Sequence, residues 1–121
     1  KDYNVFELKN ALMVKDVVKA NVIAQYMEDN KKMFPMMMVL PMLFNFYANL
    51  MMAYYAPDKS ESGIAAYLDL RNSTAMPYYN AWKVMYIISD IRKYDAMVKG
   101  YGANATEKGL LRELIYHILH K

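Results

Sequence analysis

The chain has 121 residues, which fits one domain (residues 1–121) able to bury on the order of two-thirds of its unfolded surface. Hydrophobic residues make up 56% of the chain and charged residues 22%, a composition that excludes intrinsic disorder. The absence of cysteine excludes a disulfide framework and a thiol catalyst and suits a cytoplasmic location, while a net charge of +3 is too small to indicate nucleic-acid binding by itself.

Two helices are predicted near the N-terminus. The first runs from Asn4 to Leu12, with Asn4 as its N-cap and Glu7 three residues later in the pattern of a capping box. The second runs from Lys15 to Asp29, where apolar residues recur at helical spacing. These residues are Val17, Ala20, Ile23, Ala24 and Met27.

A segment without charged residues extends from Met33 to Pro57. About twenty apolar residues can cross a bilayer, so a small membrane-embedded protein is one interpretation of this segment. We favour a central helix of a soluble bundle over Met33–Ala56, because Asn45 and Asn49 are four residues apart and place two amides on one helical face.

Prolines and turn residues set the boundaries of the next elements. The charge-free helix is expected to begin near Pro35 and to be kinked at Pro41. Residues 57–60 predict a turn, followed by a short helix through about Asp69. Residues 71–77 predict a loop, because the proline that ends this range disfavours helix at the residue before it.

Two further helices are predicted at the C-terminal end. A long helix from Tyr79 to Lys99 has an apolar stripe of Ala81, Val84, Met85, Ile88, Ile91 and Val98. The last helix ends near His120 and follows a capping pattern made by Asn104 and Glu107. Its apolar face comprises Leu110, Leu111, Leu114, Ile115 and Ile118. The sequence therefore predicts an all-α bundle of five to six helices.

The end of the long helix carries a compact motif. Asp95 and Lys99 are four residues apart, which is the spacing of an ion pair on a helix. Lys99 also suits the negative end of the helix dipole, and Gly100 suits a C-cap position. A catalytic Asp–Lys pair is the alternative, but it requires a cleft and a perturbed pKa that the sequence does not indicate. We therefore predict a structural role for the three residues.

Other candidate sites have simple structural interpretations. Glu113, His117 and His120 share one face of the last helix and in principle suit a metal ion, but a solvated face is favoured and no metal or cofactor is predicted. The twelve methionines are interpreted mainly as core residues, and the twelve tyrosines with Trp82 mainly as residues of the domain edge. No phosphate-binding loop or catalytic triad is present, so no ATPase or hydrolase is predicted.

Two groups of residues carry a resemblance to a known family. Near the N-terminus they are Tyr3, Asn4, Val5, Phe6, Glu7, Leu8, Asn10, Lys15, Asp16 and Ala20, and later the run Tyr94-Asp95-Ala96-Met97-Val98-Lys99-Gly100. In order and spacing they resemble the C-terminal collar domain of the delta subunit of bacterial DNA polymerase III, especially of the Bacteroidetes type. The similarity extends over nearly the whole chain, but the segment from Leu70 to Tyr79 is several residues shorter than the family pattern.

The resemblance implies a function in DNA replication. The delta subunit belongs to the clamp loader, which places the sliding clamp on primed DNA. Its collar domain would join the gamma or tau subunits and the delta-prime subunit without hydrolysing ATP. Two N-terminal domains, which bind the clamp, would be absent from this chain, because it starts at Lys1 and is expected to be a C-terminal fragment. Weak direct contact with primed DNA through tyrosines is an alternative function, and no membrane partner is expected.

Overall fold

The computed structural model of the chain describes residues 2–54, 75–100 and 109–120. Over these residues it contains no strand, and its elements are α1 (Val5–Met13), α2 (Val17–Asp29), α3 (Met36–Ala53), the 3-10 helix η1 (Met76–Tyr78), α6 (Ala81–Val98) and α7 (Leu110–Leu119). The predicted all-α helical bundle is confirmed for this part of the chain. The short helix predicted to end near Asp69 lies outside the described residues.

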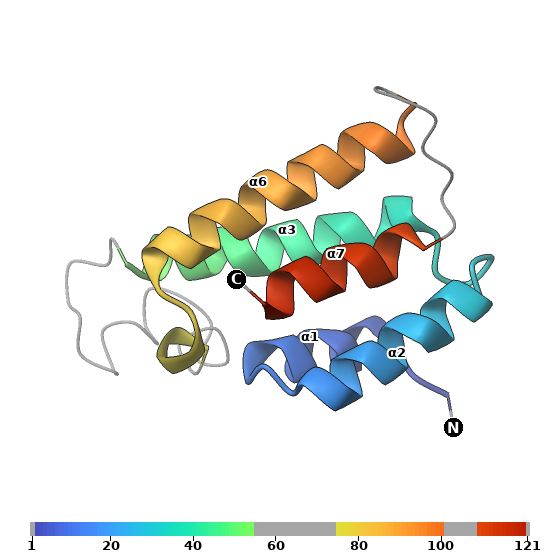
Figure 1. Cartoon of the computed structure of the whole chain (residues 1–121), viewed down its shortest axis with the longest axis horizontal. Helices are drawn as coiled ribbons and strands as arrows, with labels where there is room; N and C mark the ends of the chain where they lie inside the picture. The colour runs from blue at the N-terminus through green and yellow to red at the C-terminus, as the bar shows by residue number, and fades with distance from the viewer. Residues whose placement is uncertain (1, 55–74, 101–108, 121) are drawn as a thin grey trace.

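The helices pack as two pairs joined by α7. Helix α3 packs against α6 and α1, and α1 packs against α2. Helix α7 contacts both α2 and α6, and Figure 1 shows it between the α3–α6 pair and the α1–α2 pair. Helix α7 therefore connects the α1–α2 pair and the α3–α6 pair into one core.

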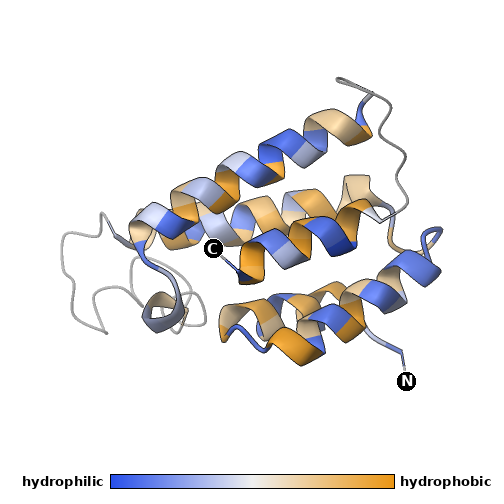
Figure 2. Ribbon diagram, viewed as in Figure 1, coloured by the Kyte–Doolittle hydropathy of each residue, from blue (hydrophilic) through white to orange (hydrophobic). Residues whose placement is uncertain are grey.

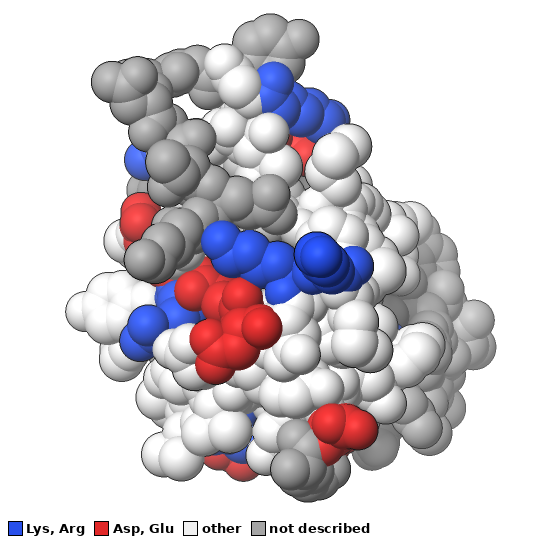
Figure 3. All heavy atoms as spheres, turned by 90° about the vertical axis from the view of Figure 1, so that its right-hand side faces the viewer, with Lys and Arg blue, Asp and Glu red and all other residues white. Residues whose placement is uncertain are grey.

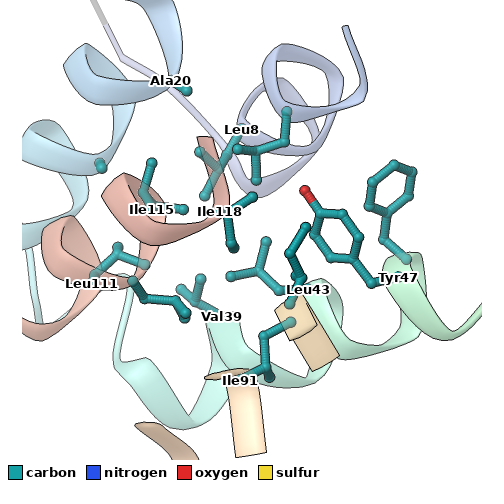
Figure 4. Close-up of a cluster of buried hydrophobic side chains, with 14 of the residues drawn as sticks. Leu8, Ala20, Val39, Leu43, Tyr47, Ile91, Leu111, Ile115 and Ile118 are labelled. Atoms are coloured by element: carbon teal, nitrogen blue, oxygen red, sulfur yellow. The ribbon is translucent and has the colours of Figure 1, made fainter. Parts of the chain in front are cut away.

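The core is built from the apolar faces of the five α-helices in the described part of the chain. Figure 4 shows Val39 and Leu43 of α3 directed toward Ile115 and Ile118 of α7, with Ile91 of α6 close by. The predicted apolar face of α7 is confirmed, since all five of its predicted residues are buried. In α2, four of the five predicted residues are buried, whereas Val17 at its first position is exposed.

Side-chain caps fix the starts of three helices. Asn4 accepts a hydrogen bond from the Glu7 backbone N–H at 2.9 Å, which confirms the first predicted helix start. Asp16 caps α2 in the same way, so α2 begins two residues after the predicted Lys15. Asn80 caps α6, so that helix also begins later than predicted. In each case a short polar side chain satisfies a free N–H of the first turn.

The buried face of α6 differs from the predicted stripe. Val84 and Ile91 are buried as predicted, but Ile87 and Tyr94 complete the buried face, and Met85 is 51% exposed. The prediction was wrong here because apolar residues stand side by side at 84–85 and 87–88, so two adjacent faces of the helix are equally apolar. Packing against α3 and α7 selects one of them.

Helix α3 is apolar on two faces, of which only one is buried. Its buried residues are Met36, Val39, Leu40, Leu43, Phe46, Tyr47, Leu50 and Ala53. Figure 2 shows apolar colours over most of its length. By its length and composition α3 could cross a membrane, and 44% of its residues are buried in the structure. Core helices of soluble proteins have the same length and composition. The predicted central helix is present, but one of its faces is exposed, with Met37, Met38, Pro41, Asn45, Asn49 and Met52.

The predicted start of helix α3 is confirmed, since the helix begins at Met36 with Pro35 as its N-cap. The helix continues through Pro41, the position of the predicted kink. One further segment differs from the predictions. Residues Met76–Tyr78 form a 3-10 turn where a loop was predicted, since Pro77 stands in the first turn, where a missing N–H costs little. Helix α7 begins after Gly109, whose φ of +81° is left-handed, and the predicted cap by Asn104 and Glu107 lies outside the described residues.

Candidate functional site

The motif at the end of α6 has the predicted geometry. The Lys99 ammonium lies 2.8 Å from the Asp95 carboxylate, and both side chains are partly exposed. Gly100 has a φ of +87°, and its N–H donates to the Met97 carbonyl at 3.0 Å. An ion pair in contact with solvent contributes at most about 1 kcal/mol, so this pair marks the end of the helix more than it stabilises the fold.

Replacing Gly100 with alanine should destabilise the domain by about 1 kcal/mol. A Cβ atom at Gly100 would meet nothing within 4 Å, so the cost would come only from the left-handed backbone. Urea unfolding followed by circular dichroism measures it. The matched control is Gly100→Asn, which tolerates this backbone and should lose less than half as much. Equal losses in the two variants would contradict the assignment.

A groove runs along the surface between α3 and α6, beside this motif. Its volume is about 290 Å³, and it is lined by Leu40, Pro41, Phe44, Asn45, Ile91, Arg92, Asp95 and Lys99. The Arg92 guanidinium lies 5.8 Å from the centre of the Phe44 ring, which is within cation–π range. The groove therefore has an apolar floor with charged groups along its α6 side.

A second groove runs along the other side of α3, next to α1. Its volume is about 370 Å³, and its lining residues are Phe6, Lys9, Met42, Asn45, Phe46 and Asn49. The Lys9 ammonium lies 5.9 Å from the centre of the Phe46 ring, and Phe6 is 61% exposed. Asn45 borders both grooves.

The two grooves and the exposed face of α3 between them form one surface. We call this surface the α3 surface; its ridge consists of Met37, Met38, Pro41, Asn45, Asn49 and Met52. Scattered apolar side chains at a protein surface are ordinary, whereas exposed apolar side chains that gather on one helix beside two grooves indicate a binding site. The α3 surface is therefore our candidate functional site. Asp95 and Lys99 line it, but Gly100 does not.

The other residues of the family resemblance mostly support the fold. Leu8 and Ala20 are buried in the core, while Asn4 and Asp16 cap helices. Tyr3, Val5, Glu7 and Lys15 are half-buried, and Asn10 is exposed. Within this group only Phe6 lines the α3 surface. The first six signature residues thus combine one groove residue with the start of α1.

A buried tyrosine pair, which the sequence does not predict, joins three elements. The Tyr79 hydroxyl donates to the Leu12 carbonyl at the end of α1 and accepts from the Tyr47 hydroxyl of α3 at 3.0 Å. Burial raises the pKa of Tyr79 to about 12 and also raises that of Tyr47. The Lys15 ammonium lies 4.8 Å from the Tyr79 ring centre, and its pKa is lowered by burial and then by Lys83. The shifts of the two tyrosines follow mainly from burial of their hydroxyl groups.

The cluster on the last helix has partners of its own. Glu113 accepts a hydrogen bond from the Tyr94 hydroxyl, and burial together with this carboxylate raises the pKa of Tyr94. The His120 ring lies 4.4 Å from the Tyr116 ring, centre to centre. Among the described residues there is no group of three potential ligands that could hold a metal ion.

The methionines are less buried than predicted. Met13, Met27 and Met36 are buried, four others are half-buried, and Met33, Met37, Met38, Met52 and Met85 are exposed. Three of the exposed methionines belong to the ridge of the α3 surface. A second exposed group lies on α6 and η1, where Trp82 is 63% exposed and contacts Tyr86 edge to face.

Charges of both signs share one end of the molecule. Figure 3 shows basic and acidic side chains next to one another in small groups at this end. Broad uncharged areas separate the groups. Among the described residues of this face, charges of both signs are therefore mixed.

Comparison with protein-family models, with curated proteins and with solved structures finds no match for this chain.

Proposed function

We propose that this chain is a non-catalytic assembly domain of a DNA polymerase III clamp loader, of the delta-subunit collar type. In this proposal the domain packs against the collar domains of neighbouring gamma or tau and delta-prime subunits. It would hold the delta subunit in register while ATP hydrolysis takes place in other subunits. The domain itself would need no cofactor and would act in the cytoplasm.

The α3 surface is the observation that carries this proposal. It exposes methionines and Phe6 over two grooves, and large apolar side chains of this kind are common where proteins meet. At the first groove Asp95 is paired with Lys99 at the surface, which is what a structural ion pair at the end of a helix requires. The helical bundle and the family signature agree with the same interpretation.

A pull-down tests the proposal. The purified chain, immobilised, should retain the collar domain of a Bacteroidetes gamma or tau subunit and should not retain the sliding clamp. The matched variant is Met38→Asp, which places a charge on the exposed ridge and should reduce retention of the collar domain at least about tenfold. Lys93→Asp, at an exposed α6 position outside both grooves, should not reduce it. Failure of a folded sample to retain the collar domain would contradict the proposal.

Direct contact with DNA is the second candidate, and the exposed rings on α6 favour it. Trp82 and Tyr86 have ring centres 5.5 Å apart and lie on either side of Lys83 in the sequence, so they offer a stacking surface close to a cation. Titration with primer–template DNA distinguishes the two candidates. Binding that falls steeply with salt and is lost in Trp82→Ala would favour this second function.

A further inference from the structure

The charges along the α3 surface are unequal. Of the charged residues that line its two grooves, Lys9, Arg92 and Lys99 are cations and only Asp95 is a carboxylate. Asp95 is engaged by Lys99 at 2.8 Å. Lys9 and Arg92 lie on opposite sides of α3, each over an aromatic ring of that helix. An apolar floor is thus bordered on both sides by positive charge.

The shape of the surface suits a helix. Residues 91 to 99 of α6 border one groove, and this length of helix spans about 12 Å, or roughly two turns. An amphipathic helix placed along such a groove contacts it through apolar side chains at spacings of three, four and seven residues. The amides of Asn45 and Asn49 lie on the ridge and line the second groove, so a helix docked there needs polar side chains at the edge of its apolar stripe to form hydrogen bonds with them.

We infer that the α3 surface binds an amphipathic helix of a partner protein whose apolar stripe is flanked by aspartate or glutamate side chains. The apolar stripe would cover the grooves, and the acidic side chains would lie next to Arg92 and Lys9. A second copy of this chain fits less well, because it would bring the same excess of cations against itself. This inference names the contact chemistry of the assembly proposed above and rests on that proposal.

An anionic membrane also combines apolar and negative groups. The α3 surface favours a helix over a membrane because its apolar side chains line two grooves and because Asn45 and Asn49 would meet hydrocarbon without hydrogen-bond partners. Membrane binding is therefore an outcome for the test to separate.

The test uses two synthetic helical peptides of about 16 residues with identical leucine stripes. One carries glutamates beside the stripe, and its twin carries lysines at the same positions. Fluorescence polarisation with the full chain should show at least about tenfold tighter binding of the acidic peptide in low salt, and the preference should shrink as salt rises. Vesicles containing anionic lipid provide the third probe.

Charge-reversal variants locate the contact. Arg92→Glu and Lys9→Glu should each weaken binding of the acidic peptide about tenfold, whereas Lys93→Glu, with the same charge change on an exposed site outside the grooves, should change it less than about twofold. Circular dichroism verifies that each variant is folded. Three results would overturn the inference: no binding of either peptide, equal binding of both, or binding to vesicles alone.

The two proposals fail in different ways. If the collar domain is retained in the pull-down but Arg92→Glu and Lys9→Glu leave that retention unchanged, the assembly function stands and the α3 surface is the wrong contact. If the acidic peptide binds and the collar domain is not retained, the contact chemistry is correct and the clamp-loader assignment is wrong.

Discussion

Replacing Leu43 with alanine should lower the free energy of unfolding by about 3 kcal/mol, the largest effect we expect from a single core truncation. Leu43 is fully buried at the centre of α3. Figure 4 shows its side chain among residues of α3, α6 and α7, so its truncation removes contacts with three helices and leaves a cavity in the core. A loss of this size is a large fraction of the stability of a domain this small.

Urea unfolding monitored by circular dichroism measures this effect. The matched control is Met52→Ala in the same helix, because Met52 is exposed and its truncation should change stability by less than about 0.5 kcal/mol. A Leu43→Ala variant as stable as the Met52→Ala variant would show that α3 does not form the core described here.

Replacing Tyr79 with phenylalanine should lower the free energy of unfolding by about 2 kcal/mol. The change removes a hydrogen bond to the Leu12 carbonyl and leaves the buried Tyr47 hydroxyl without its acceptor. Tyr47→Phe should cost less, about 1 kcal/mol, because the Tyr79 hydroxyl keeps its bond to Leu12. The double variant should lose less than the sum of the single losses, since both residues share one network. Tyr78→Phe, at an exposed neighbouring position, is the control.

The same tyrosine predicts a dependence on alkaline pH. Burial raises the pKa of Tyr79 from 10.0 to about 12, so the folded protein holds this proton more tightly than the unfolded chain does. The stabilisation is therefore complete below pH 10 and is lost as the pH rises from 10 to 12. In Tyr79→Phe the fall in stability over this interval should be smaller. An unchanged pH profile would contradict the buried position of the Tyr79 hydroxyl.

Local sequence signals predicted the helices well. Asn4 with Glu7, and the apolar face of α7, correspond to caps and periodicities that act over a few residues. The Asp95–Lys99 pair and the left-handed Gly100 are equally local, and both are present. Such features depend on neighbours along the helix, so the sequence alone contains enough information to place them.

Features that depend on packing between helices were not predictable in the same way. The stripe of α6 was misplaced at Met85 because two of its faces are equally apolar and only contact with α3 and α7 distinguishes them. The Tyr47–Tyr79 pair joins residues 32 positions apart, beyond any local pattern. The exposed face of α3 was not predicted. The composition of a helix shows that it is apolar, but it does not show how many of its faces pack against other helices.

A competition experiment tests the clamp-loader assignment most directly. A preassembled Bacteroidetes clamp loader containing fluorescent delta subunit is mixed with increasing amounts of this chain, and the delta that remains in the complex is measured by size-exclusion chromatography. We predict that the chain enters the complex and displaces the delta subunit. The Met38→Asp variant should displace less delta subunit than the unchanged chain at the same ratio. If the complex keeps all its delta subunit and the folded chain elutes separately at every ratio, the chain does not occupy the delta collar position.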